Sequence, residues 1–393
     1  MSSMKSILIL GIVLTGTMLK AQTVNVAKAF SGAEKQTRVL LQEIEKDTLA
    51  AKKNLVSPRT VENGKLKMVG SGDWTSGFFP GELWLFYEYT KDPKWKALAI
   101  TYTEKVKKEQ FNTRTHDLGF MMYCSFGNGY RLTGDTAYRN VIIQSAKSLA
   151  KRFNPGAGVI KSWDHNGAKW KYPVIIDNMM NLELLFETTR LTGDSSFYHI
   201  AVSHANNTLK NHFRPDFSSW HVLDYDTTTG QVLQKVTAQG YSDNSSWARG
   251  QAWALYGFAM CYRETRNRAY LDQANGIAGF ILSNAVTPAD GVPYWDYNDP
   301  AIPNTSRDAS AAAITAAALY ELEGYAPGKG YRKAADKLLL ALNKKYTASP
   351  GTNKGFILEH STGHRPANSE IDVPINYADY YYLEALLRSL IVQ

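Results

Sequence analysis

The sequence predicts an all-α fold in which six helical hairpins close into an (α/α)6 barrel. Three observations lead to this prediction: a short helix-breaking phrase recurs, apolar helices alternate with amphipathic ones, and strand patterns are sparse. The chain has 393 residues, of which 44% are hydrophobic and 20% charged. It therefore has enough apolar surface for a large core, and its composition does not indicate disorder.

The recurring phrase marks the corner of each hairpin. It reads Thr-Gly-Asp at residues 133–135 and 192–194, with an aromatic residue three positions after each Asp. Residues 90–95 repeat it with Lys in place of Gly, and weaker copies lie at 265–270 and 328–331. Gly ends one helix in a left-handed turn and Asp caps the next, so each phrase predicts a tight helix–turn–helix corner.

The segments on either side of these corners differ in polarity. The segments before a corner are apolar on nearly every face, which predicts buried inner helices. Those after a corner carry a one-sided apolar stripe, which predicts outer helices. Inner helices are expected at residues 77–89, 118–132, 178–191, 248–264, 309–322 and 377–391, and outer ones include 27–51, 137–152 and 331–345.

The sequence leaves two features of this architecture undecided. An open two-layered array of the same hairpins is the alternative to a closed barrel. The long connections at residues 163–173 and 217–243 are candidates for short β-hairpins.

The N-terminus reads as a signal peptide over residues 1–21, followed by a single barrel domain over residues 22–393. Lys5 precedes a short apolar run that starts at Ile7, and Ala21 is the small residue before the expected cleavage site. The run is too short to span a membrane. We therefore expect a periplasmic or secreted protein without a membrane span. Cys124 and Cys261 are expected to be buried free thiols, with a single disulfide as the alternative.

The net charge is +8, and it becomes +6 after loss of Lys5 and Lys20 with the signal peptide. The basic residues form no dense run, which argues against a nucleic-acid partner and leaves room for a small anionic ligand. The sequence does not indicate an oligomeric state.

Polar clusters stand at the predicted N-terminal ends of the inner helices, so they should converge on one mouth of the barrel. Helix N-termini favour anions there. The clusters are Asp73-Trp74, His116-Asp117, Asp177-Asn178, residues 246–249, Arg307-Asp308 and residues 376–379.

Asp117 and Asp177 head successive inner helices, which pack roughly 8–10 Å apart. Two carboxylates facing one pocket raise the pKa of one of them, which suits general acid–base catalysis on a sugar. Each Asp is equally explained as a helix cap, and by position alone Asp73, Asp308 and Asp379 are comparable candidates.

Other side chains near this mouth are candidate substrate contacts. His116 and His221 are candidate hydrogen-bond partners, and Gln239 and Arg249 can donate to a carboxylate. Trp74, Trp163 and Trp253 are candidate sugar platforms, although core packing explains them as well. His360 and His364 lack a third ligand at a convincing spacing, so no metal site is expected.

Taken in order, these clusters resemble the unsaturated glucuronyl hydrolases, glycoside hydrolase family 88. The resemblance covers nearly all of the chain after residue 21. The matching stretches are Asp73-Trp-Thr-Ser-Gly-Phe-Phe-Pro-Gly-Glu-Leu-Trp84, His116-Asp-Leu-Gly-Phe120, Ile176-Asp-Asn-Met-Met-Asn-Leu182, Gln239-Gly-Tyr-Ser-Asp-Asn-Ser-Ser-Trp-Ala-Arg-Gly-Gln-Ala-Trp253, Tyr294-Trp-Asp296, Arg307-Asp-Ala-Ser-Ala-Ala-Ala-Ile314 and Tyr377-Ala-Asp-Tyr-Tyr-Tyr-Leu-Glu-Ala385.

The resemblance implies an (α/α)6 barrel and assigns roles to the candidate residues. Asp177 would be the general acid and base, and Asp117 would hold sugar hydroxyls and tune its partner. His221, Gln239, Arg249 and Trp253 would surround an unsaturated uronate, and Trp74 and Trp163 would help to shape its pocket. Some members of the family have His before the Gln, where this chain has Ala238, and this difference leaves the finer substrate class open.

The implied reaction removes a terminal 4,5-unsaturated uronic acid from an acidic oligosaccharide that a polysaccharide lyase has made. Asp177 would protonate C4 of the vinyl ether, and water would add at C5. This reaction would need neither a metal nor an organic cofactor. Three alternatives remain: an unsaturated rhamnogalacturonyl hydrolase acting on pectin fragments, a non-catalytic sugar-binding barrel, and an inverting glycosidase acting on saturated substrates.

Overall fold

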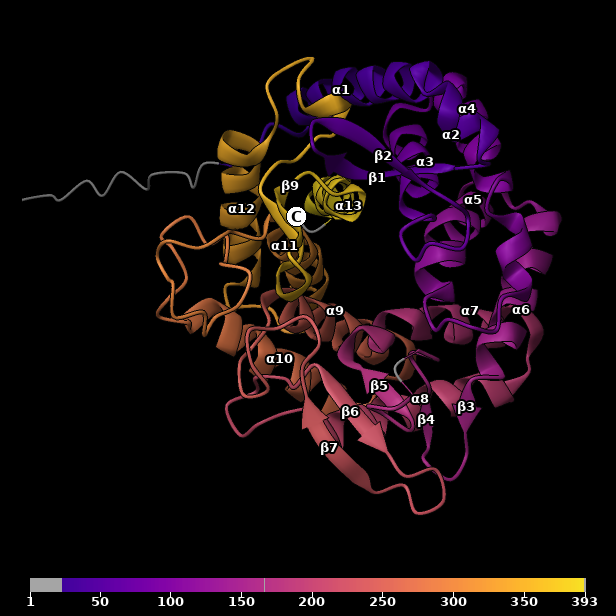
Figure 1. Cartoon of the computed structure of the whole chain (residues 1–393), viewed down its shortest axis with the longest axis vertical. Coiled ribbons are helices and arrows are strands. Elements are labelled where there is room, and N and C mark those ends of the chain that lie inside the picture. Colours follow the sequence, from indigo (N-terminus) through magenta and orange to yellow (C-terminus); the bar gives the residue numbers. More distant parts are fainter. Residues whose placement is uncertain (1–22, 166, 392–393) are drawn as a thin grey trace, which may run out of the picture.

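The computed structural model describes residues 23–391 except residue 166, and within this part of the chain the helices form two concentric rings (Figure 1). The predicted signal peptide, residues 1–21, lies outside the described residues. The inner ring consists of α3 (Phe78–Thr90), η2 with α5 (Gly119–Gly127, Asn128–Thr133), η3 with α7 (Ile176–Asn181, Leu182–Thr192), α9 (Ala248–Thr265), α11 (Ala309–Glu323) and α13 (Asn376–Ile391).

The outer helices alternate with the inner segments along the chain, and each corner joins an inner segment to the outer helix that follows it. The outer ring consists of α1 (Val26–Lys46), α4 (Pro93–Glu104), α6 (Thr136–Ala150), α8 (Ser195–Asn211), α10 (Arg268–Ser283) and α12 (Tyr331–Ala341). The last inner helix, α13, packs against both α11 and the first inner helix, α3. The ring is therefore closed, as the hairpin count predicted, and the open array is excluded.

The predicted corners have the expected backbone and caps. Gly134 and Gly193 have φ of 70° and 75°, a left-handed conformation that glycine adopts without steric cost. Asp135 and Asp194 then cap α6 and α8 by accepting the backbone N–H two residues on. The same phrase thus ends an inner helix and starts an outer one.

Two inner segments depart from the regular helices that the sequence predicted. Residues Gly119–Gly127 form a π-helix and Ile176–Asn181 form a 3-10 turn. The two segments touch closely: a Cβ on Gly119 would lie 2.5 Å from the Cα of Asn181, and Asn181 Oδ1 accepts the N–H of Phe120. π-Helical segments are rare and often mark functional sites, and this one begins two residues after Asp117.

Short antiparallel strands fill the connections over one end of the barrel. The pairs are β1 with β2 (Ser57–Glu62, Lys65–Val69), β3 with β4 (Phe153–Asn154, Val159–Ile160), β8 with β9 (Ser361–His364, Ser369–Val373), and β5 with β6 and β7 (Pro173–Ile175, Val222–Tyr225, Val232–Val236). The hairpin expected in residues 217–243 is present as β6–β7. The described part of residues 163–173 holds none of its own, because β5 pairs with β6 instead.

The main hydrophobic core contains residues from Ala29 to Leu386 and is built from helices of both rings. Cys124 and Cys261 are buried free thiols, which excludes the alternative of a disulfide. No described helix is long and apolar enough to cross a membrane.

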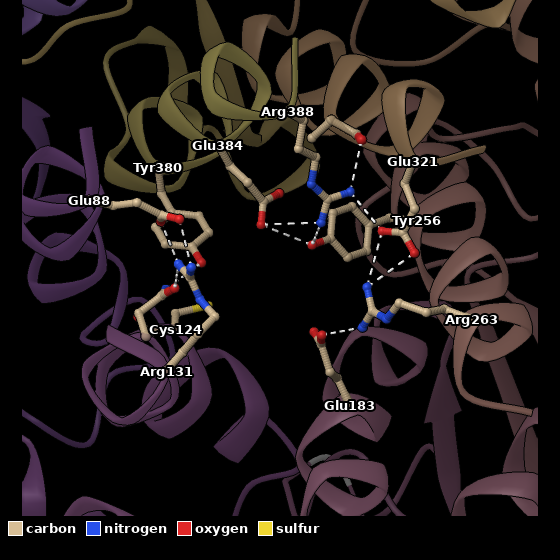
Figure 2. Close-up of polar contacts among 12 residues, drawn as sticks. Glu88, Cys124, Arg131, Glu183, Tyr256, Arg263, Glu321, Tyr380, Glu384 and Arg388 are labelled. Carbon is tan, nitrogen blue, oxygen red and sulfur yellow. Dashed lines mark hydrogen bonds and ion pairs between the residues drawn. The ribbon is translucent and has the colours of Figure 1, made fainter. Parts of the chain in front are cut away.

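Ion pairs join the last turns of α9, α11 and α13 to the first turn of α7 (Figure 2). Arg263 of α9 contacts Glu183 of α7 and Glu321 of α11, and Arg388 of α13 contacts the same Glu321 at 2.8 Å. This arrangement links four inner helices through one network.

Candidate active site

A cavity of about 260 Å³ lies at the N-terminal ends of the inner helices. Of the nine site residues predicted from the sequence, seven line it: Trp74, His116, Asp117, Trp163, Asp177, Gln239 and Arg249. The polar clusters of successive hairpins therefore converge on one mouth, as the barrel requires.

Asp177 stands at the start of the turn η3 and is 8% exposed. Burial raises the pKa of its carboxyl to about 7; the Arg249 guanidinium opposes this rise, and the nearby Asp117 adds to it. A carboxyl group in this state exchanges a proton near neutral pH, which is the property that a combined acid and base needs.

Asp117 faces the same cavity from the chain just before the π-helix η2. Its Oδ2 accepts the hydroxyl of Thr115 at 2.9 Å, and its Oδ1 lies 3.2 Å from Nε2 of His116. His116 is fully buried, and burial lowers its pKa. Asp117 is thus held by two neighbours while its side chain keeps a 14% exposed fraction.

Arg249 connects the cavity to the strand β8. Its Nη1 donates to Asp308 Oδ2 at 3.1 Å and to the carbonyl of Thr362, and its Nη2 donates to the carbonyl of Gly363 at 2.6 Å. The guanidinium lies over the rings of Trp247 and Tyr377. The Nε–H group is buried and has no partner among the described residues. Arg249 therefore anchors β8 while its side chain lines the cavity.

Two predicted residues do not line the cavity. His221 lies behind Asp177, with Nε2 3.7 Å from Asp177 Oδ2. Trp253 is fully buried and packs against Phe120 and Tyr377, which do line the cavity. Trp253 therefore supports the floor of the cavity from inside the barrel.

Two charged lining residues were missed by the sequence analysis. Arg59 of β1 donates through Nε and Nη2 to both carboxylate oxygens of Glu370 of β9, at 2.5 and 2.8 Å, and through Nη1 to Asp73 at 2.8 Å. The residues are 311 positions apart in the chain, and no local pattern indicates that they meet. The other lining residues that were not predicted as site residues are Phe120, His165, Trp170, Ile175, Ala238, Gly363, His364 and Tyr377.

The chemistry of this cavity is that of acid–base catalysis on a small anionic ring. Trp74, Trp163, Trp170 and Tyr377 provide aromatic walls, and Gln239 and Arg249 provide donors. Within residues 23–391, leaving out residue 166, no group of three or more His, Cys, Asp or Glu side chains could hold a metal ion.

Comparisons with known proteins agree with this chemistry. The model of Glycosyl Hydrolase Family 88 matches residues 47–388. An unsaturated glucuronyl hydrolase of Formosa agariphila is 47% identical over 97% of this chain and 96% of its own, and an unsaturated chondroitin disaccharide hydrolase of Streptococcus pneumoniae is 34% identical over 89% of both chains. A crystal structure of an unsaturated glucuronyl hydrolase specific for heparin is 44% identical with a TM-score of 0.88, over 93% of this chain and 97% of its own.

Proposed function

The chain belongs to glycosyl hydrolase family 88, and on this premise we propose that it removes a terminal 4,5-unsaturated uronic acid by hydration, with Asp177 as both acid and base. The observation that carries the proposal is the position of Asp177, which lies in the cavity beside Asp117 with a pKa raised to about 7.

The reaction begins with a proton transfer. The substrate has a C4=C5 double bond next to the ring oxygen, and this vinyl ether accepts the carboxyl proton of Asp177 at C4. Positive charge then develops on C5 and the ring oxygen. The Asp177 carboxylate takes a proton from water as the water oxygen bonds to C5, which returns the acid to its starting state.

The resulting hemiketal at C5 is unstable. The bond between C5 and the ring oxygen breaks to give a ketone, and C1 then carries both a hydroxyl and the leaving sugar. Collapse of this hemiacetal forms an aldehyde and releases the neighbouring sugar with its hydroxyl. Every atom comes from the substrate and one water molecule, so the scheme requires no further reactant.

The residues around Asp177 support its role as acid and base. Asp117 is held by Thr115 and His116 and can accept hydrogen bonds from sugar hydroxyls. Arg249 and Gln239 offer donors to the uronate carboxylate, and inner-helix N-termini at this mouth favour an anion.

We propose glycosaminoglycan-derived disaccharides as the substrate class. Two of the relatives described above are named for heparin and for chondroitin disaccharides. A panel of unsaturated disaccharides from heparin, chondroitin, hyaluronan, ulvan and pectin tests this proposal. Turnover of the pectin fragment alone would instead assign the chain to the rhamnogalacturonyl branch.

We also propose that the enzyme is exported and loses residues 1–21, on the basis of Lys5, the apolar run after it and Ala21. Sequencing the N-terminus of the protein from the periplasmic or culture fraction tests this. A mature chain that starts at Gln22 supports export, and an intact Met1 in the cytoplasmic fraction contradicts it.

The variant Asp177→Asn tests the central assignment. It keeps the size of the side chain and removes the transferable proton, so kcat should fall by at least about 10³-fold, the range of acid–base catalysis. The measurement is the loss of ultraviolet absorbance of the double bond. Asp272→Asn, at an exposed position of α10, is the matched control and should keep full activity. Substantial turnover by Asp177→Asn would remove Asp177 from the role.

A further inference from the structure

His221 is fixed behind the acid residue by its packing. It lies directly before β6 and is 4% exposed. The rings of Trp163 and Trp247 lie against it, with ring centroids 5.9 and 4.8 Å away. The imidazole plane is therefore fixed, and each ring nitrogen has its own surroundings.

The first ring nitrogen, Nδ1, faces two backbone donors. The N–H groups of Ala238 and Gln239 both donate to it, each at 3.1 Å. A nitrogen that accepts hydrogen bonds carries no hydrogen, and a neutral imidazole then carries its hydrogen on the other nitrogen. Backbone amides cannot become acceptors, so this tautomer does not depend on any side chain.

The imidazole also stays neutral. Burial lowers the pKa of His221 well below its usual range, and His364, Arg249, His212 and His116 act in the same direction. The acidic group that faces it is Asp177, at 3.7 Å. His221 therefore keeps one N–H group, at Nε2, throughout the pH range in which Asp177 gains and loses its proton.

One particular oxygen of Asp177, Oδ2, lies close to this N–H group, 3.7 Å from Nε2. Nε2 of His221 and Oδ2 of Asp177 are both buried, and neither has a hydrogen-bond partner among the described residues. Since Oδ2 is inaccessible while the Asp177 side chain keeps an 11% exposed fraction and lines the cavity, Oδ1 is the carboxyl oxygen that reaches the cavity.

We infer that His221 is a positioning residue that keeps the transferable proton of Asp177 on Oδ1, the oxygen facing the substrate. A hydrogen on Oδ2 would meet the N–H group of His221 head-on, whereas an unprotonated Oδ2 can accept from it once the two atoms, 3.7 Å apart, approach by roughly half an ångström. The same contact restrains rotation of the carboxyl group between proton donation and proton return. This inference rests on the proposed function and gives His221 a role that acts through Asp177.

A matched pair of variants separates this role from simple anchoring of residues 238–239. His221→Gln places an amide N–H group at about the reach of Nε2, and His221→Asn places an acceptor at about the position of Nδ1. We expect His221→Gln to keep kcat within about tenfold of the wild type. His221→Asn should lose a further 10- to 100-fold in kcat, about the cost of misplacing a catalytic group by 1 Å, with little change in KM.

The pH profile gives a second readout. Because an N–H donor favours the carboxylate, its loss raises the pKa of Asp177, and the alkaline limb of kcat/KM should move to higher pH in His221→Asn but stay in place in His221→Gln. If the two folded variants have the same kcat and the same alkaline limb of kcat/KM against pH, the inference is overturned.

Imidazole nitrogen NMR of the ¹⁵N-labelled wild type tests the tautomer without any substrate. The signal that disappears in His221→Gln should show an unprotonated Nδ1 and a protonated Nε2 from pH 5 to 9. A His221 that titrates in this range, or that carries its hydrogen on Nδ1, would contradict the inference. If the enzyme hydrates no unsaturated disaccharide, the proposed function is wrong. The NMR measurement needs no substrate and still shows which nitrogen of His221 carries the hydrogen.

Discussion

At the scale of single residues, burial of the Asp177 carboxylate lowers the folding stability of the protein. Its ordinary pKa is 3.8, and burial in the fold raises it to about 7. The folded state therefore binds a proton more tightly than the unfolded chain does. The stability that comes from this difference is complete below about pH 4 and is lost as the pH rises through 7. The protein thus gives up stability at neutral pH to keep a usable acid.

The variant Asp177→Asn should reveal this cost, because it removes the charge that burial penalises. We expect its free energy of unfolding to exceed that of the wild type at pH 8 by up to about 4 kcal/mol, and the two to converge at pH 4. Urea unfolding followed at several pH values measures the difference. A variant less stable than the wild type at pH 8 would show that Asp177 is not penalised in the fold.

Residue types alone indicated part of this site. Asp177, Asp117 and Arg249 stand at the starts of inner helices, so the hairpin pattern was enough to bring them to one mouth. Arg59 and Glu370 could not be predicted, because their ion pair depends on hairpins from opposite ends of the chain. Trp253 was expected to contact substrate, but its ring packs inside the barrel, and its residue type does not distinguish the two positions.

At the scale of secondary-structure elements, the corners were predictable and the starts of two inner helices were not. The phrase Thr-Gly-Asp contains both the left-handed turn and the cap, so local chemistry fixes it. The π-helix η2 and the 3-10 turn η3 arise where Gly119 and Asn181 meet. That contact belongs to the packed barrel, and no periodicity of either segment indicates it.

The ion network around Arg263 should contribute to the stability of the inner ring. Arg263 contacts Glu183 of α7 and Glu321 of α11 (Figure 2). It also contacts Glu264 of its own helix, α9. The variant Arg263→Met should lose about 1–3 kcal/mol of unfolding free energy, because half-buried Glu183 loses its contact with Arg263 and Glu321 keeps only its contact with Arg388. Thermal or urea unfolding measures this loss, and KM should change little because the network lies away from the cavity.

Arg268→Met is the matched control for this network. Arg268 lies on the outer helix α10 and its side chain is 73% exposed in a pair with Asp272. Its loss should change the free energy of unfolding by less than about 0.5 kcal/mol. Similar losses in the two variants would show that the network does not hold the inner ring together.

At the scale of the whole molecule, the inner helices of the barrel run in the same direction. The inner segments begin at the active-site mouth, so their positive ends surround the cavity that receives the anionic sugar, and α9, α11 and α13 end at the ion network. Pairing of Thr60 with Ile375 brings the first and last hairpins together beside this mouth. Closure of the ring and completion of the site therefore depend on the same contacts.

In the proposed reaction, the enzyme protonates C4 of the C4=C5 bond and water adds at C5. The most direct measurement is wild-type turnover of an unsaturated disaccharide in D₂O, with the product analysed by NMR and mass spectrometry at early times. Hydration predicts one deuterium at C4 of the released uronic acid derivative. A product that keeps its double bond and carries no deuterium at C4 would show direct cleavage of the glycosidic bond and would contradict the account.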